Sequence, residues 1–147
     1  MAEASQTGGQ FELPIRVYIE DTDAGGIIFH AKYLHYMERA RTEWVRSRGV
    51  ELRAGLAENI SYVVQSLSIS YCRPGRLDDL LQVSADLVQC GRVWMEFEQK
   101  VVRVSDNALL AAARIRVACI ALDTGRPRRL PASISALMAA ASNNQPE

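Results

Sequence analysis

The chain turns at Glu20-Asp21-Thr22-Asp23-Ala24-Gly25-Gly26-Ile27-Ile28-Phe29-His30, where acids and two adjacent glycines separate a strand-like run from a helix-like run. Such a turn brings carboxylates close to the free amides at the N-terminus of the helix. A carboxylate can attack a carbonyl carbon or take a proton from water, and helix-end amides can hold an oxyanion. The sequence therefore predicts a type of reaction as well as a fold.

The residues on either side of this turn define the elements that it joins. Residues 11–19 alternate apolar and polar side chains, which predicts a strand. Residues 31–48 carry apolar side chains on one stripe at helical spacing, which predicts a long helix ended by Gly49. A short helical or irregular connector is expected at 51–59, and a second helix from about 131 to 141. Period-two alternation predicts four more strands, over residues 63–71, 80–89, 93–104 and 108–122.

This order of elements predicts an α+β domain with a five-stranded antiparallel sheet and one long helix. Short turns between alternating strands favour antiparallel pairing. One helix cannot cover both faces of such a sheet, so we expect a second copy of the chain to cover the rest. The domain is predicted over residues 11–141, with a disordered N-terminal tail at 1–10 and a loose C-terminal tail at 142–147.

Composition excludes several classes of function. The chain has 147 residues, and its 17 Lys plus Arg balance its 17 Asp plus Glu. Zero net charge argues against nucleic acid as the main partner, since phosphate binding needs a basic excess. No apolar run approaches the roughly 20 residues of a membrane helix, and the N-terminus lacks a signal-peptide pattern. Three widely spaced cysteines, Cys72, Cys90 and Cys119, are expected to be free thiols in a reducing compartment, so we expect a cytoplasmic protein.

Several segments together resemble a known family. They are Arg16–Gly26, His30, Tyr33 and Met37–Arg41, then Tyr71, Pro74 and Arg76–Asp79, and finally Leu130-Pro131. They resemble the hotdog-fold acyl-CoA thioesterases, and within these are most similar to the YbgC-like branch of the 4-hydroxybenzoyl-CoA thioesterase family, associated with the Tol-Pal cell-envelope system. The resemblance covers roughly residues 13–138 and implies a hotdog fold, a sheet wrapped around a long helix.

The resemblance also implies an activity and its partners. The substrate would be an acyl-CoA, hydrolysed to a free acid and coenzyme A without a metal or other cofactor, in lipid metabolism. The protein would be a homodimer or homotetramer with active sites at the dimer interface. An acyl carrier protein is a further candidate partner.

Asp23 is the first candidate for the catalytic acid. The family's acid falls on this second Asp of the motif, and small neighbours would let it reach a carbonyl carbon. Direct attack and deprotonation of water are both open, because thioester hydrolysis can use either. The structural alternative is an Asp that caps the turn. Asp21 is the rival acid, with loop stabilisation through local hydrogen bonds as its expected role.

The turn also supplies candidate binding groups. Gly25 and Gly26 let the backbone approach a ligand closely, although turn formation alone would explain them. The resemblance puts the backbone N–H of His30 against the thioester oxygen, with Ala31 beside it among the substrate-binding residues. The His30 side chain would orient Asp23 or water, contact the thioester, or simply pack at the helix end. A metal role for it is not expected, because His30 and His35 are the only histidines.

Other candidates lie further along the chain. Tyr62, Val63 and Val64 would help form an acyl pocket across the dimer interface, or serve as ordinary strand core. Arg73 and Arg76 suit the phosphates of coenzyme A or an acidic carrier protein, while surface solubility explains most single arginines in this chain.

Some hotdog thioesterases use a helix glutamate instead of a loop aspartate. Glu38 and Glu43 occupy the long helix here, and since a loop Asp is present we expect them to be solvated or ion-paired.

Two functions compete with hydrolysis. One is a hotdog hydratase or dehydratase, and the other is a weakly catalytic or non-catalytic protein that binds an acyl carrier protein or an envelope complex.

Overall fold

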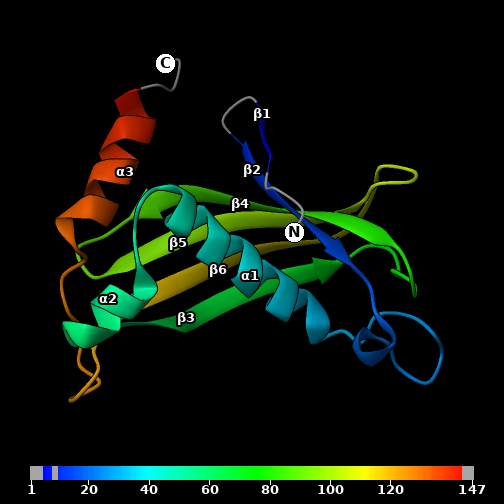
Figure 1. The fold of residues 1–147 in the computed structure, drawn as a ribbon, viewed down its shortest axis with the longest axis horizontal. Coiled ribbons are helices and arrows are strands. Elements are labelled where there is room, and N and C mark those ends of the chain that lie inside the picture. Colours follow the sequence, from blue (N-terminus) through cyan, green and yellow to red (C-terminus); the bar gives the residue numbers. More distant parts are fainter. Residues whose placement is uncertain (1–4, 8–9, 144–147) are drawn as a thin grey trace. The chain divides into compact units, whose positions relative to one another are not determined.

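The structure is a computed structural model that describes residues 5–7 and 10–143. Its elements are shown in Figure 1. In chain order they are β1 (Ser5–Thr7), β2 (Gln10–Arg16), the 3-10 helix η1 (Ile19–Asp21), α1 (Lys32–Ser47), α2 (Leu52–Ala57), β3 (Ile60–Tyr71), β4 (Leu80–Cys90), β5 (Trp94–Arg103), β6 (Ala108–Ala121) and α3 (Ala132–Asn143).

The strands form one antiparallel sheet in the order β1-β2-β4-β5-β6-β3. The five long strands and α1 confirm the predicted α+β class. β1 is an addition at the edge, paired with β2 through Gln6 opposite Phe11, and lies within the segment predicted as a disordered tail. Residues 1–4, 8–9 and 144–147 lie outside the described residues, so the predicted tails and domain limits stay predictions.

The chain divides into two compact units, which are described separately. The first comprises the described residues up to Trp44 with Ser68–Asp86 and Glu98–Arg114, and the second comprises Val45–Leu67, Leu87–Phe97 and the described residues from Ile115 on.

The core of the first unit is built by α1 against the sheet. The helix buries an apolar stripe at helical spacing, namely Tyr33, Tyr36, Met37, Ala40 and Trp44. One polar side chain, Gln99 of β5, lies in this core at 1% exposure and joins helix to strand. Its Nε2 donates to the carbonyls of Met37 (2.9 Å) and Ser84 (3.1 Å), and its Oε1 accepts from Arg41 (2.9 Å). Satisfying every polar group of a buried amide keeps it from destabilising the core.

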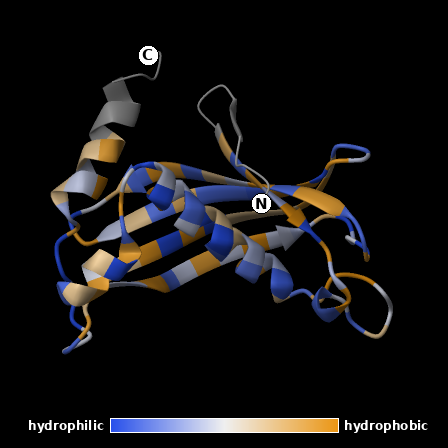
Figure 2. Cartoon of the chain, viewed as in Figure 1, coloured by the Kyte–Doolittle hydropathy of each residue, from blue (hydrophilic) through white to orange (hydrophobic). Residues whose placement is uncertain are grey.

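The second unit buries apolar side chains of β5 and β6 and of the chain around the start of α3. Met95, Phe97, Ile115, Val117 and Cys119 are buried at alternate positions, as the period-two pattern predicts, and Figure 2 shows this alternation as bands along the strands. Leu130 and Ile134 are buried around the start of α3. The Arg128 guanidinium donates to the carbonyls of Glu58 (2.8 Å) and Asn59 (3.1 Å), which secures the C-terminal end of α2.

One strand prediction needs correction. The strand predicted over 11–19 ends at Arg16, and Ile19 is 75% exposed in η1, because the Asp21 carboxylate accepts the Tyr18 amide and turns the chain. The strand predicted over 63–71 is confirmed as part of β3, in which Val63, Leu67 and Tyr71 are each 40% exposed or more. β3 is an edge strand of the sheet. None of the helices in the described part of the chain combines the length and apolar composition that crossing a membrane requires.

Candidate active site

The acid and glycine turn folds back on itself through backbone hydrogen bonds. Thr22 and Ile28 face each other across an antiparallel bridge, and the Asp23 amide donates to the Ile27 carbonyl at 2.9 Å. The Gly26 amide closes the tip by donating to the Asp23 carbonyl at 3.1 Å. Gly26 has φ 79°, a left-handed conformation that glycine adopts without strain. The bridge therefore carries Asp23 back alongside the residues that lead to His30.

The side chain of Asp23 is exposed at this tip. Its Oδ1 accepts a 2.8 Å hydrogen bond from the Gly25 amide, which orients the carboxylate within its own turn. No other hydrogen bond to this carboxylate occurs among the described residues. One carboxylate oxygen is thus held in place while the other is open to a substrate or to water.

Asp21 has the opposite environment, with 6% exposure. Its carboxylate accepts the Tyr18 amide at 3.0 Å and lies 3.6 Å from the Lys32 ammonium nitrogen. Burial, and next the nearby Asp21 carboxylate, raise the pKa of Tyr36 above its ordinary value. The Asp21 carbonyl also accepts the Phe29 amide at 2.9 Å. Asp21 therefore joins both ends of the turn to α1.

The approach to α1 contains two consecutive peptide units with engaged carbonyls. The Lys32 amide donates to the Phe29 carbonyl at 2.8 Å, and the Tyr71 hydroxyl donates to the His30 carbonyl at 3.0 Å. Neither the His30 amide nor the Ala31 amide donates a hydrogen bond to a backbone carbonyl of the described residues. The exposed His30 ring lies 4.5 Å from the Phe29 ring centroid and 6.4 Å from that of Tyr71. Two adjacent N–H groups are thus available at the start of the helix.

A second segment, residues 73–79, supports the turn from outside. Ile27 and Arg76 form a bridge, the Ile28 amide donates to the Gly75 carbonyl at 2.9 Å, and the Gly75 amide donates to the Tyr33 hydroxyl at 3.2 Å. Glycine leaves room for this contact, since a Cβ at position 75 would overlap the Cδ1 of Ile28 unless that side chain shifts.

Arg103 holds this supporting segment. Its guanidinium contacts Asp79 at 3.2 Å and the Pro74 carbonyl at 3.3 Å, and forms two 3.0 Å bonds to Asp106. Hydrogen bonds from Arg103, with a further one from the Ala108 amide, lower the pKa of Asp106. The bonds to Asp106 and then to Asp79 raise the pKa of Arg103.

The first unit gathers most of the candidate residues predicted from the sequence. Asp23, Gly25 and Gly26 share the tip of the turn, His30 and Ala31 precede α1, and Arg73 and Arg76 are exposed in the supporting segment. Tyr62, Val63 and Val64 belong to the part of β3 in the second unit, where burial raises the pKa of Tyr62 to about 12. Their acyl-pocket role stays a prediction. Tyr71 was noted in the sequence only as part of a pattern, because nothing local marks its contact with His30.

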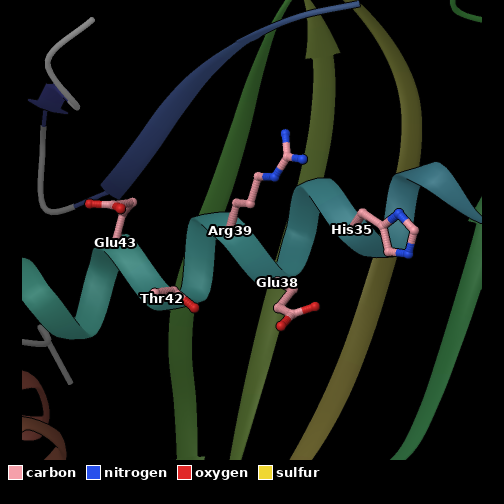
Figure 3. Close-up of a pocket in the computed structure, with 5 residues that line it drawn as sticks. All are labelled: His35, Glu38, Arg39, Thr42 and Glu43. Atoms are coloured by element: carbon pink, nitrogen blue, oxygen red, sulfur yellow. The ribbon is translucent and has the colours of Figure 1, made fainter. Parts of the chain in front are cut away.

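The helix glutamates lie elsewhere on the first unit. Glu38 and Glu43, with His35, Arg39 and Thr42, line a shallow polar hollow on the exposed face of α1 (Figure 3). All five side chains come from one helix, and none comes from the acid and glycine turn. No cluster of three or more His, Cys, Asp or Glu side chains suited to a metal ion occurs within residues 5–7 and 10–143.

An antiparallel sheet with one long helix against it, and an acid and glycine turn leading into that helix, define the hotdog class of protein. Residues 17–138 match the sequence model of the thioesterase-like superfamily. The chain therefore belongs to this superfamily and is a thioester hydrolase.

Individual relatives agree with this assignment. The chain is 40% identical over 127 residues to the acyl-CoA thioesterase YbgC of Haemophilus influenzae, which covers 86% of this chain and 92% of that protein. It is also 40% identical over 126 residues to the acyl-CoA thioester hydrolase YbgC of Escherichia coli O6:H1, covering 86% and 93%. Among solved structures, a 1,4-dihydroxy-2-naphthoyl-CoA thioesterase from Synechocystis superposes with a TM-score of 0.82 at 23% identity, over 89% of this chain and 96% of that one. The hotdog fold and the YbgC-like resemblance predicted from the sequence are both confirmed.

Proposed function

We propose that this protein hydrolyses acyl-CoA thioesters to a free acid and coenzyme A, with Asp23 as the catalytic carboxylate. The observation that carries the proposal is the exposed Asp23 side chain, held by the Gly25 amide at 2.8 Å in a turn that doubles back toward His30. The two YbgC relatives are named as acyl-CoA hydrolases, which supports the substrate class.

Two routes are consistent with this arrangement. In the first, Asp23 attacks the thioester carbon, the C–S bond breaks, coenzyme A leaves as a thiolate that takes a proton, and water then hydrolyses the mixed anhydride. In the second, Asp23 takes a proton from water as the water attacks the thioester carbon, and the C–S bond then breaks as coenzyme A leaves as a thiolate that takes a proton. In either route the carbonyl oxygen becomes negative, and the His30 and Ala31 amides at the start of α1 would stabilise it.

The remaining predicted residues would bind the substrate. Arg73 and Arg76 are exposed beside the turn and would pair with coenzyme A phosphates. Tyr62, Val63 and Val64 would line the acyl pocket, completed by a second copy in a homodimer or homotetramer. No metal takes part in the proposed steps. An acyl carrier protein as a candidate partner, and a cytoplasmic location, belong to the same proposal.

The test is an acyl-CoA panel assayed with a thiol reagent, using the wild-type protein, Asp23→Asn and Asp78→Asn. Asparagine keeps the oxygen that accepts the Gly25 amide but cannot attack or take a proton. We expect a fall in kcat of about 10³-fold or more for Asp23→Asn. Asp78→Asn is the matched control, because Asp78 is exposed and its left-handed backbone (φ 71°) tolerates asparagine.

Three outcomes would contradict the proposal. Equal rates for wild type and Asp23→Asn would remove Asp23 from its role. Hydration of an enoyl-CoA without thioester cleavage would indicate a hotdog hydratase instead. Stable capture of acyl carrier protein with negligible turnover would favour a binding protein.

A further inference from the structure

The hydroxyl of Tyr71 makes a contact that neither strand pairing nor helix formation requires. It donates a 3.0 Å hydrogen bond to the His30 carbonyl, across 41 residues of sequence. Tyr71 is the last residue of β3. Its ring lies edge-on to Tyr33, at 5.5 Å between centroids, and to His30, at 6.4 Å. Aromatic neighbours on two sides hold the phenol in the direction that reaches His30.

This bond fixes the orientation of one peptide unit. In a trans peptide the carbonyl and the N–H point in opposite directions. The His30 carbonyl and the Ala31 amide belong to the same unit, so the Tyr71 hydroxyl determines where the Ala31 N–H points. The preceding unit, which ends in the His30 N–H, is fixed in the same way by the Lys32 amide on the Phe29 carbonyl. A hydrogen bond accepted by the carbonyl also polarises its peptide, making the N–H a stronger donor.

Neighbouring tyrosines do not supply this contact. The Tyr33 hydroxyl accepts the Gly75 amide at 3.2 Å. The Tyr36 hydroxyl is buried and makes no hydrogen bond within the described part of the chain. Of the two peptide units before α1, one is therefore held by backbone and the other by a single side chain.

We infer that Tyr71 is a positioning residue for hydrolysis, which aims and polarises the Ala31 amide at the oxyanion. The inference rests on the proposed function, because it assigns Tyr71 to that same site. It differs from direct catalysis, in which the phenol would donate its proton to the substrate. It also differs from a purely structural role, in which the hydroxyl would contribute to stability alone.

The test compares Tyr71→Phe, which keeps the ring and removes the hydroxyl, with Tyr18→Phe and Asp23→Asn. Loss of a whole oxyanion donor costs about 10²–10³ in kcat, so misdirecting one should cost about tenfold, with KM changed less than about twofold. The pH profile should keep its shape and the unfolding midpoint should barely move. Tyr18→Phe makes the same chemical change on a 63% exposed tyrosine that precedes the turn, and it should keep the wild-type rate. In nuclear magnetic resonance spectra, the Ala31 amide nitrogen should shift in Tyr71→Phe but not in Tyr18→Phe.

The possible results distinguish a failure of the Tyr71 role from a failure of the proposed catalytic site. A wild-type rate in Tyr71→Phe while Asp23→Asn is inactive would overturn the role of Tyr71 and leave the function intact. Loss of the basic limb of the pH profile would replace positioning by direct proton donation. An unshifted Ala31 resonance would also overturn the inference. Full activity in Asp23→Asn would instead overturn the proposed catalytic site.

Discussion

Two neighbouring turns of one loop carry acids in opposite surroundings. In η1, Asp21 is 6% exposed and is held by the Tyr18 amide and the Lys32 ammonium group. In the next turn, the Asp23 side chain is exposed, and among the described residues its carboxylate accepts a hydrogen bond from the Gly25 amide alone. The two side chains are chemically identical and two residues apart. Packing therefore decides which carboxylate is an anchor and which is free to react.

With Asp23 as the proposed catalytic acid, the contrast suggests how one loop could be both rigid at its base and reactive at its tip. Bonds at the base, from Asp21 to α1 and from Gly75 to Ile28, leave the tip few ways to move. The tip can then expose an acid without losing its geometry, which is what preorganised catalysis needs.

The largest effect is expected from moving the reactive carboxylate without removing its charge. Asp23→Glu adds one methylene, and a displacement of about 1 Å can cost about 100-fold in kcat/KM. Unfolding by urea should be unchanged within about 0.5 kcal/mol, since the residue is exposed. Glu20→Asp, the reverse change on an exposed neighbour, is the control and should keep full activity. Full activity in Asp23→Glu would argue that the carboxylate need not be positioned.

A change at Asp21 should affect stability more than activity. Asp21→Asn removes the charge that faces Lys32, and hydrogen bonds to charged groups contribute about 1.5–3 kcal/mol. We expect the free energy of unfolding to fall by about 2 kcal/mol, measured with urea. The folded fraction should retain hydrolysis well above that of Asp23→Asn. Unchanged stability with activity lost would instead make Asp21 the essential acid.

Local pattern was sufficient to predict much of the fold. The alternating apolar side chains of β4 are buried as expected, at Leu81, Val83 and Ala85. The apolar stripe of α1 is likewise buried, at Met37 and Trp44. These residues report their environment through spacing alone, because one face of each element meets the core. The family resemblance added the expectation of a hotdog thioesterase and of Asp23 as its catalytic acid.

The remainder depends on partners that are distant in sequence. Gln99 interrupts an apolar series, and only its bonds to Met37 and Ser84 explain its burial. Tyr71 looks like an ordinary strand aromatic until its bond to His30 is seen. Ile19 fits the period of a strand but lies within the turn that Asp21 closes with the Tyr18 amide. Spacing cannot reveal a contact that tertiary structure creates.

The supporting segment offers a smaller test of the base of the loop. Gly75→Ala would place a methyl group against Ile28, and overpacking typically costs 1–3 kcal/mol; since the clash involves the end of a side chain, about 1 kcal/mol is expected. Gly55→Ala is the matched control, because a Cβ there would make an ordinary 3.7 Å contact and alanine favours helix α2. Thermal unfolding should shift downward for the first variant and slightly upward for the second. Equal shifts would mean that the fit of Gly75 against the turn is unimportant.

The smallest effect is expected from a change at Asp106. Its carboxylate binds the Arg103 guanidinium, which also contacts the Pro74 carbonyl and Asp79. Arg103 lowers the pKa of Asp106 in the folded protein, so its contribution to stability is present above the unfolded value of about 3.9. That contribution is lost as the pH falls through the lower, folded value. Asp106→Asn should therefore unfold at slightly lower urea than wild type at pH 7, and the gap should close toward pH 3. Hydrolysis at pH 7 should be equal in both proteins, because Asp79 still binds Arg103. A difference in urea midpoint that stays constant with pH would show that the charge of Asp106 does not contribute.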